Sequence, residues 1–191
     1  PAFDPVTSDQ LRLGNYPLGG AFTGRINMNL REAKGYTYGA RSGFRAYKRG
    51  GEFVASASVK ADTTAASIQE FLFEIQGVTS GARPVTEDEH RKAVGALVQA
   101  EPGSFEAMGE VLAQFAWADA QGWPAGHVEA SAARVASIPL DVAQRAFADV
   151  VKGEDLLILV VGDRALAGPA VEALGLGPID VRDDEGRPLQ E

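Results

Sequence analysis

A glycine-punctuated stretch from residue 19 to residue 39, GGAFTGRINMNLREAKGYTYG, constrains the fold of this chain more than any other part of the sequence. The pair Gly19-Gly20 allows a sharp bend with positive φ. A short amphipathic segment, Phe22 to Glu32, has the pattern of a helix. Gly35 follows it in the C′ position, where glycine commonly ends a helix. The stretch therefore predicts a bend, a short helix that stops at Gly35, and a strand that starts immediately afterwards.

The residues after Gly35 have the pattern of a β-hairpin. Apolar and polar residues alternate from Tyr36 to Lys48 and from Glu52 to Lys60, which predicts two strands. Arg49-Gly50-Gly51 between them is a hairpin turn signal.

Helix signals occupy most of the remaining sequence. Helices are predicted to start near Thr7 (running to about Leu18, interrupted by Pro17), Asp62, Thr86, Ser104, His127, Pro139 and Leu166.

Two further strands are expected towards the end of the chain. The run from Asp155 to Gly162 is apolar on both faces, as a central strand is, and Ile179 to Arg182 has the pattern of a last short strand. No repeat or linker divides the sequence. We predict one α+β domain over residues 1–191, with a mostly antiparallel sheet, helices packed on one face and a loose polar tail at 183–191.

Composition excludes several classes of function. A net charge of -8 argues against nucleic-acid binding, which needs a concentrated positive surface. The absence of cysteine excludes disulfides, thiolate catalysis and cysteine zinc sites, and is compatible with both the bacterial periplasm and the cytoplasm. The longest apolar run, Leu156 to Val161, is far too short for a membrane span. The chain lacks an initiator Met, so we expect it to be part of a longer polypeptide.

No complete set of catalytic or metal-binding residues is evident. The two histidines, His90 and His127, have no metal-ligand spacing, and neither H-E-x-x-H nor H-x-x-E-H occurs. We interpret His90 as part of an exposed helix N-terminus and His127 as a helix-start or surface residue. No serine lies in a G-x-S-x-G context, and the glycines at 19–24 lack the lysine and hydroxyl of a phosphate-binding loop.

The run Asn29-Leu30-Arg31-Glu32, followed by Lys34-Gly35-Tyr36-Thr37-Tyr38-Gly39, resembles the second, non-zinc domain of the pitrilysin/insulinase-type zinc metallopeptidases. A similar order of weaker matches extends the resemblance from about Asp9 to Asp163. It implies a metallopeptidase/LuxS-like two-layer fold, N-terminally incomplete here. In that family two similar α+β halves enclose a chamber. One half holds zinc through H-x-x-E-H and a distant glutamate, and the other half lends an arginine and a tyrosine to the same site.

The resemblance places that pair at Arg31 and Tyr38, seven residues apart. It implies that the Arg31 guanidinium holds backbone carbonyls of an extended peptide and that the Tyr38 hydroxyl donates to the oxyanion beside zinc. Tyr36 competes for the tyrosine role, because residues two apart in a strand point to the same face. Without the resemblance, the preferred interpretation is that Arg31 caps the carbonyls of a helix end and that Tyr38 fills a sheet face.

The resemblance also implies the partners of the chain. We expect no metal in this chain, zinc in a homologous domain or subunit, and a peptide as substrate; the chain alone is then not expected to hydrolyse peptides. If the sheet is incomplete, its exposed edge favours a homodimer. Two alternatives use the same fold: a non-catalytic scaffold like the core subunits of respiratory complexes, and a generic α+β binding domain.

Overall fold

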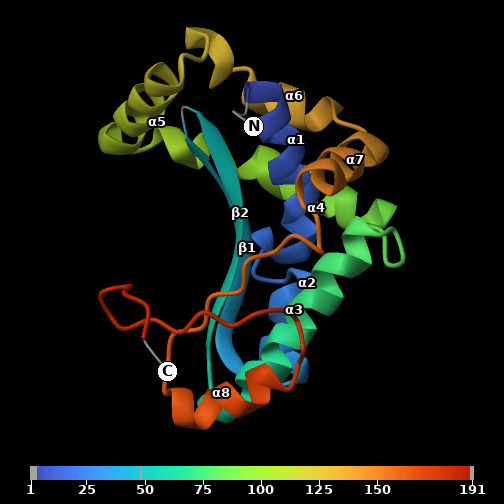
Figure 1. Cartoon of the computed structure of the whole chain (residues 1–191). Helices are drawn as coiled ribbons and strands as arrows, with labels where there is room; N and C mark the ends of the chain where they lie inside the picture. The colour runs from blue at the N-terminus through green and yellow to red at the C-terminus, as the bar shows by residue number, and fades with distance from the viewer. Residues whose placement is uncertain (1–3, 48, 190–191) are drawn as a thin grey trace.

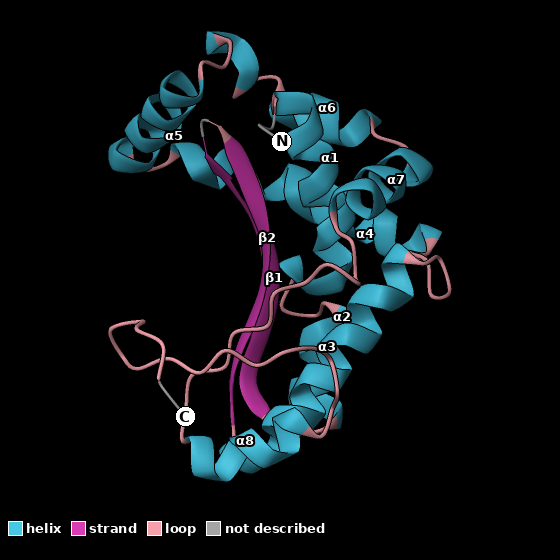
Figure 2. Cartoon of the chain, viewed as in Figure 1, coloured by secondary structure: helices cyan, strands magenta, loops and turns pink. Residues whose placement is uncertain are grey.

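The computed structural model describes residues 4–47 and 49–189. A long two-stranded antiparallel sheet forms a curved ribbon, and helices from both halves of the chain cover one of its sides (Figure 1). Helix α5 and the C-terminal segment extend away from this helical layer, at opposite ends of the ribbon (Figure 2). The expected α+β fold, with an antiparallel sheet and helices packed on one face, is confirmed.

The elements follow one another with short connections. In chain order they are α1 (Pro5–Asn15), η1 (Tyr16–Gly20), α2 (Arg25–Asn27), η2 (Met28–Ala33), β1 (Thr37–Tyr47), β2 (Gly50–Val59), η3 (Ala61–Thr63), α3 (Thr64–Thr79), α4 (Glu87–Ala100), η4 (Pro102–Phe105), α5 (Met108–Gln121), η5 (Ala125–His127), α6 (Ser131–Ser137), α7 (Leu140–Val150) and α8 (Arg164–Glu172). Segments η1 and η2 are π-helices, and η3 to η5 are 3-10 helices.

The helix starts agree with the sequence signals in part. Thr86 caps α4 in a full capping box with Glu89, as its sequence predicts. Helix α1 begins earlier than predicted, because the Asp4 side chain accepts a hydrogen bond from the Thr7 N–H at 2.9 Å and Thr7 itself lies inside the helix. Ser104 does not cap α5. Its hydroxyl instead donates to a carbonyl within the preceding turn, and α5 begins four residues later, at Met108.

The register of the hairpin determines which side chains of the sheet face the helices. Ala40 pairs with Ala57, Ser42 with Ala55 and Phe44 with Phe53, so the face that meets the helices carries two pairs of small side chains followed by one aromatic pair. The turn predicted at Arg49-Gly50-Gly51 lies too far along the chain. Gly50 and Gly51 belong to β2, where they pair with Tyr47 and Ala46, and Lys48 lies outside the described residues.

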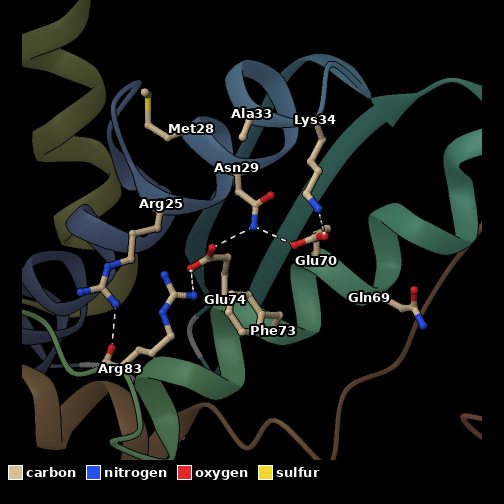
Figure 3. A pocket seen from close by; sticks show the side chains of 10 residues that line it. All are labelled: Arg25, Met28, Asn29, Ala33, Lys34, Gln69, Glu70, Phe73, Glu74 and Arg83. Atoms are coloured by element: carbon tan, nitrogen blue, oxygen red, sulfur yellow. Dashed lines mark hydrogen bonds and ion pairs between the residues drawn. The ribbon is translucent and has the colours of Figure 1, made fainter.

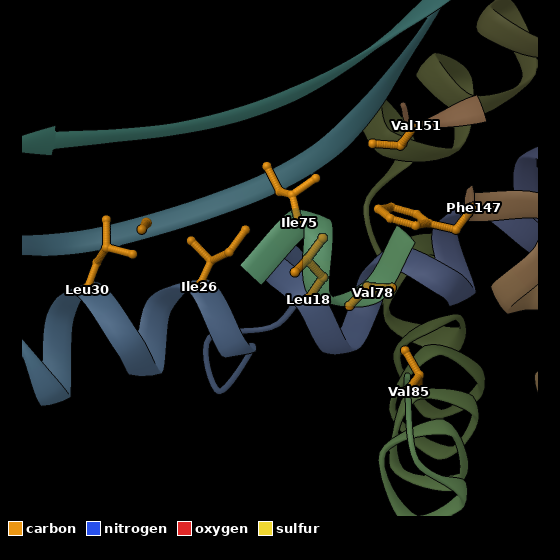
Figure 4. Packing of buried hydrophobic residues seen from close by; sticks show 9 residues of the cluster. Leu18, Ile26, Leu30, Ile75, Val78, Val85, Phe147 and Val151 are labelled. Atoms are coloured by element: carbon orange, nitrogen blue, oxygen red, sulfur yellow. The ribbon is translucent and has the colours of Figure 1, made fainter. Parts of the chain in front are cut away.

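The core lies between this face of the sheet and helices α2, α3 and α7 (Figure 4). Three aromatic rings contact one another in this core: Phe44, Phe53 and Phe147 pack pairwise in tilted or edge-to-face geometry, with centroids 5.3 to 5.9 Å apart. Such tilted and edge-to-face contacts add to the free energy gained from burial. Phe147 is fully buried and is the largest side chain in this cluster. A second cluster packs α1 against α4, α6 and α7 around Leu13 and Val135.

The glycine pair at 19–20 serves a different purpose from the one its sequence predicts. Neither glycine has a positive φ, and the chain continues from α1 into the π-helix η1 instead of bending sharply. Gly19 is needed for close approach, because a Cβ there would lie 2.4 Å from Ser42 Oγ. Asn15 holds Ser42 in this position, because its amide group donates to the Ser42 carbonyl and accepts from the Ser42 hydroxyl.

The two strands predicted near the C-terminus are not formed. Residues 155–162 are extended, but no backbone hydrogen bond pairs them with β1 or β2 among the described residues, and a strand requires such a ladder. Leu156 is partly buried against the core, but the rest of the segment is exposed, with Leu157 95% accessible to solvent. At 179–182 only an isolated bridge between Arg182 and Pro188 is present.

The aromatic cluster makes a testable prediction about stability. Phe147→Ala removes a fully buried ring and leaves a cavity, so we expect the free energy of unfolding to fall by about 3–5 kcal/mol. Urea denaturation followed by circular dichroism measures this change. Leu176→Ala, at a half-exposed position, is the control and is expected to change it by less than about 0.5 kcal/mol. Equal effects of the two substitutions would contradict the placement of the core.

Candidate functional site

Arg31 lies in an unusual helical segment. Within η2 the Lys34 N–H donates to the Asn29 carbonyl five residues back, at 3.0 Å, which is the hydrogen-bond pattern of a π-helix. Such segments are rare and often occur at functional sites. The segment ends as the sequence predicts, with Gly35 at φ 66° just beyond the last helical residues. Nothing lies within 4 Å of a Cβ at Gly35, so the backbone angle alone requires glycine there.

The Arg31 side chain lies on the surface of the molecule between an aromatic ring and a carboxylate. Its guanidinium carbon lies over the ring of Phe22, 4.6 Å from the centroid, and one nitrogen pairs with Glu32 at 3.1 Å. The side chain is 34% exposed. A guanidinium carries five N–H donors, which is more than the pair with Glu32 uses. Arg31 in this pose is therefore able to donate to a ligand.

Tyr38 lies in a β-bulge at the start of β1. Thr37 pairs with Val59 and Ala40 pairs with Ala57, so one strand has an extra residue between these pairs. The Thr37 hydroxyl closes the bulge: it lies 2.7 Å from the Ser58 carbonyl and accepts from the Gly39 N–H at 3.0 Å. The bulge leaves the Tyr38 side chain fully exposed. Bulges often re-aim a side chain beside a functional site.

Tyr36 occupies a different environment from Tyr38, although the sequence suggests that both face the same side. Tyr36 precedes β1, and its backbone N–H donates to the Leu30 carbonyl at 2.9 Å, at the end of η2. Strand alternation therefore does not apply between the two tyrosines, since the strand starts at Thr37 and the bulge follows at once. Tyr36 is half-buried, whereas Tyr38 is fully exposed.

Asn27 connects the two parts of the site. Its side chain is buried, at 2% exposure, and uses both ends of its amide. Nδ2 donates to the Phe22 carbonyl at 2.7 Å, and Oδ1 accepts from the Ala40 N–H at 2.9 Å. The loop that carries the ring under Arg31 is thereby fixed to the strand that carries Tyr38.

A second set of contacts holds η2 against α3. The two segments meet at an open groove of about 750 Å³ lined by charged side chains (Figure 3). Asn29 Nδ2 donates to both Glu70 and Glu74 at 2.9 Å. Glu74 is almost completely buried and pairs with Arg83 at 3.0 Å, and Lys34 pairs with Glu70 at 2.8 Å. The charges in this groove thus neutralise one another, and we interpret it as a structural seam.

Arg25 anchors the start of the same segment to α4. Its guanidinium donates to both carboxylate oxygens of Glu89, at 2.7 and 2.6 Å, and to the carbonyls of Arg83 and Pro84. Burial alone would raise the pKa of Glu89, but hydrogen bonds from Arg25 and Thr86 outweigh it and lower that pKa to about 2. Arg25 therefore fixes the orientation of the helical segment from which Arg31 projects.

Neither histidine lies in a metal-binding group. Within residues 4–47 and 49–189 no cluster of three or more His, Asp or Glu side chains could hold a metal ion. His90 Nε2 lies 3.1 Å from the Ile138 carbonyl, and the ring of His127 packs edge-on against Trp123. Burial lowers the pKa of His127.

None of the described helices has the length and apolar character needed to cross a membrane.

Residues 1–97, just over half of the chain, match a family model described as the peptidase M16 inactive domain. This match confirms the resemblance expected from the motif around Arg31 and Tyr38. No curated protein matches the chain.

Solved structures share the fold. The peptidase M16 inactive domain from Pseudomonas fluorescens is 20% identical with a TM-score of 0.68, over 76% of this chain and 34% of that chain. The inactive peptidase domain of a protein described as a zinc protease from Bordetella parapertussis is 20% identical with a TM-score of 0.65, over 78% and 80%. A protease from Helicobacter pylori is 17% identical with a TM-score of 0.66, over 80% and 36%. The present chain thus spans about a third of the P. fluorescens chain.

The Arg25–Glu89 pair makes the stability of the chain depend on pH. Because the pKa of Glu89 is lowered on folding, its contribution is complete above the unfolded value of 4.5 and is lost as the pH falls towards 2. Nearly a third of this side chain is exposed, so solvent screening limits the effect to roughly 1–2 kcal/mol. We expect Glu89→Gln to destabilise the chain at pH 6 and the difference from wild type to narrow towards pH 2.5.

Urea denaturation at several pH values measures this dependence. The matched control is Glu87→Gln, an exposed acid in the first turn of the same helix. A wild-type and Glu89→Gln difference that stays constant from pH 6 to pH 2.5 would show that the ion pair does not stabilise the fold.

Proposed function

The chain belongs to the peptidase M16 inactive-domain family, and from that membership we propose that it is the substrate-binding, non-zinc domain or subunit of a zinc-dependent peptide hydrolase. In this proposal Arg31 and Tyr38 act in a peptide-hydrolysis site whose zinc is held by another domain or subunit. The names of relatives such as the B. parapertussis protein, described as a zinc protease, support this class of reaction.

The observation that supports the proposal most is the way in which Arg31 and Tyr38 reach the surface. Each projects from an irregular piece of backbone, a π-helix and a β-bulge. Both kinds of irregularity are frequent at functional sites. Asn27 ties the two pieces together. A helix-end cap and a sheet-filling residue, the alternative roles for this pair, leave the full exposure of Tyr38 unexplained.

The chemistry of the two side chains suits peptide hydrolysis. Zinc on the companion domain or subunit would supply Lewis-acid activation of water and the scissile carbonyl. The Tyr38 hydroxyl is a neutral donor that can hydrogen-bond the oxyanion as its charge develops. The Arg31 guanidinium presents several N–H donors, which fit the backbone carbonyls of an extended peptide. Tyr36, half-buried at the end of η2, remains the competitor for a contact with the peptide.

The proposal predicts distinct kinetic effects for the two residues. We expect Tyr38→Phe to lower kcat by about 10²-fold with little change in KM, because a hydroxyl that binds the oxyanion acts mainly in the transition state. We expect Arg31→Ala to lower kcat/KM by about tenfold or more, chiefly through KM, because its hydrogen bonds hold the substrate in the ground state as well. Peptide cleavage by the chain combined with its zinc-bearing partner measures both.

Matched controls lie on β1, the strand that carries Tyr38. Arg41→Ala and Tyr47→Phe alter an arginine and a tyrosine that are also exposed on β1, and both are expected to leave kcat and KM unchanged. If Arg31→Ala and Tyr38→Phe leave turnover at the wild-type level, the chain does not contribute to catalysis, and the scaffold role becomes the better explanation of the fold.

A further inference from the structure

Phe22 is a large apolar side chain that gains little from burial. It lies in the loop between η1 and α2 and is 69% exposed. Its ring contact is with the guanidinium of Arg31, 4.6 Å from the ring centroid. This distance is well within the range of about 6 Å over which a cation is attracted to an aromatic face.

The loop that holds Phe22 is tightly fixed. The Ala21 N–H donates to the Tyr16 carbonyl at 3.1 Å, and the Gly24 N–H donates to the Ala21 carbonyl at 2.9 Å. A Cβ on Gly24 would come within 2.9 Å of that same carbonyl oxygen, so the turn has no room for a side chain there. The backbone on both sides of Phe22 therefore has little freedom to move.

Asn27 fixes Phe22 from the inside of the molecule. The buried amide donates to the Phe22 carbonyl, and its oxygen accepts from the Ala40 N–H. Each end of the amide faces the partner it needs, so rotating it by half a turn would set oxygen against oxygen and N–H against N–H. The position of the exposed ring is thus set by the same strand that carries Tyr38.

We propose that Phe22 is a positioning residue for Arg31: its ring is a rigid platform that holds the guanidinium in the pose that receives the peptide. This inference rests on the proposed function of Arg31. An arginine side chain has several rotatable bonds and loses rotamer freedom when it binds. A ring anchored at its backbone removes part of that freedom before substrate arrives, and the guanidinium keeps more N–H donors than its pair with Glu32 uses.

The inference predicts that substitutions at Phe22 act only through Arg31. Phe22→Leu keeps an apolar side chain but removes the aromatic face, and we expect it to lower kcat/KM by about twofold to fivefold, the effect of an exposed cation–π contact. Phe22→Tyr keeps the face and is expected to retain wild-type activity. In an Arg31→Ala background, Phe22→Leu is expected to have no further effect, because the group that it positions is gone.

The chain offers a matched control for the loss of a cation–π contact. Phe73 is also exposed, at 53% against 69% for Phe22, and the guanidinium of Arg83 lies over its ring at 4.4 Å in the groove between η2 and α3. Phe73→Leu thus removes the same kind of contact away from Arg31. We expect it to leave kcat/KM unchanged both in the wild-type and in the Arg31→Ala background.

A readout that does not involve activity separates this inference from the proposed function. In the wild-type chain the ring is expected to shift the NMR resonance of the Arg31 Nε–Hε group upfield. We expect the shift to be lost in Phe22→Leu and kept in Phe22→Tyr and Phe73→Leu. If Arg31→Ala has no effect on turnover while the shift behaves in this way, the catalytic role of Arg31 is wrong but the platform itself is real.

Two results would overturn the inference. One is an Arg31 resonance that is the same in Phe22→Leu and the wild type. The other is an Arg31→Ala substitution that impairs cleavage while Phe22→Leu either has no effect or has the same effect in both backgrounds. Either result would make Phe22 only an exposed loop residue, and neither would contradict the proposed function of Arg31, which the turnover of Arg31→Ala tests.

Discussion

The buried amide of Asn27 is the interaction on which the arrangement of the candidate site depends. It joins two backbone segments that have no ladder of their own between them, the loop at Phe22 and the strand at Ala40. A buried amide is stable only when both its donor and its acceptor are paired, so these segments cannot shift relative to each other without leaving a polar group unpaired. The spacing between the Arg31 side and the Tyr38 side of the site is set in this way.

The segment that carries Arg31 is also fixed at its outer face. Arg25 joins it to α4 through Glu89, and Asn29 joins it to α3 through Glu70 and Glu74. A π-helix has a wider turn than an α-helix and is seldom stable by itself, so such anchors on several sides favour its persistence. The site therefore rests on packed helices, while the groups proposed to act remain at the surface. This division suits a site that must be rigid and still accessible to a peptide.

The sequence predicts the parts of this structure that depend on local backbone chemistry. The stop at Gly35, the capping box at Thr86 and the hairpin follow from residue types and spacing, and the family follows from the motif that contains Arg31 and Tyr38. Asn27 and the bulge at Tyr38 could not be predicted, because both depend on which distant backbone groups come to lie beside them. The segment at 155–162 was wrongly predicted as a buried strand for a related reason. Its apolar composition is typical of a buried strand, but a strand forms only beside a partner strand. No partner strand lies beside this segment among the described residues.

That extended segment has a consequence for the behaviour of the chain in solution. Leu156 to Val161 is a run of six apolar residues, without charge or proline, whose side chains at alternate positions are almost fully exposed. Runs of this length and composition are those that stack into intermolecular cross-β ladders. The acidic residues Asp155 and Asp163, which flank the run, oppose such stacking by charge repulsion. The colloidal stability of concentrated samples is thus expected to fall as ionic strength rises, since salt screens the repulsion and leaves the apolar attraction intact.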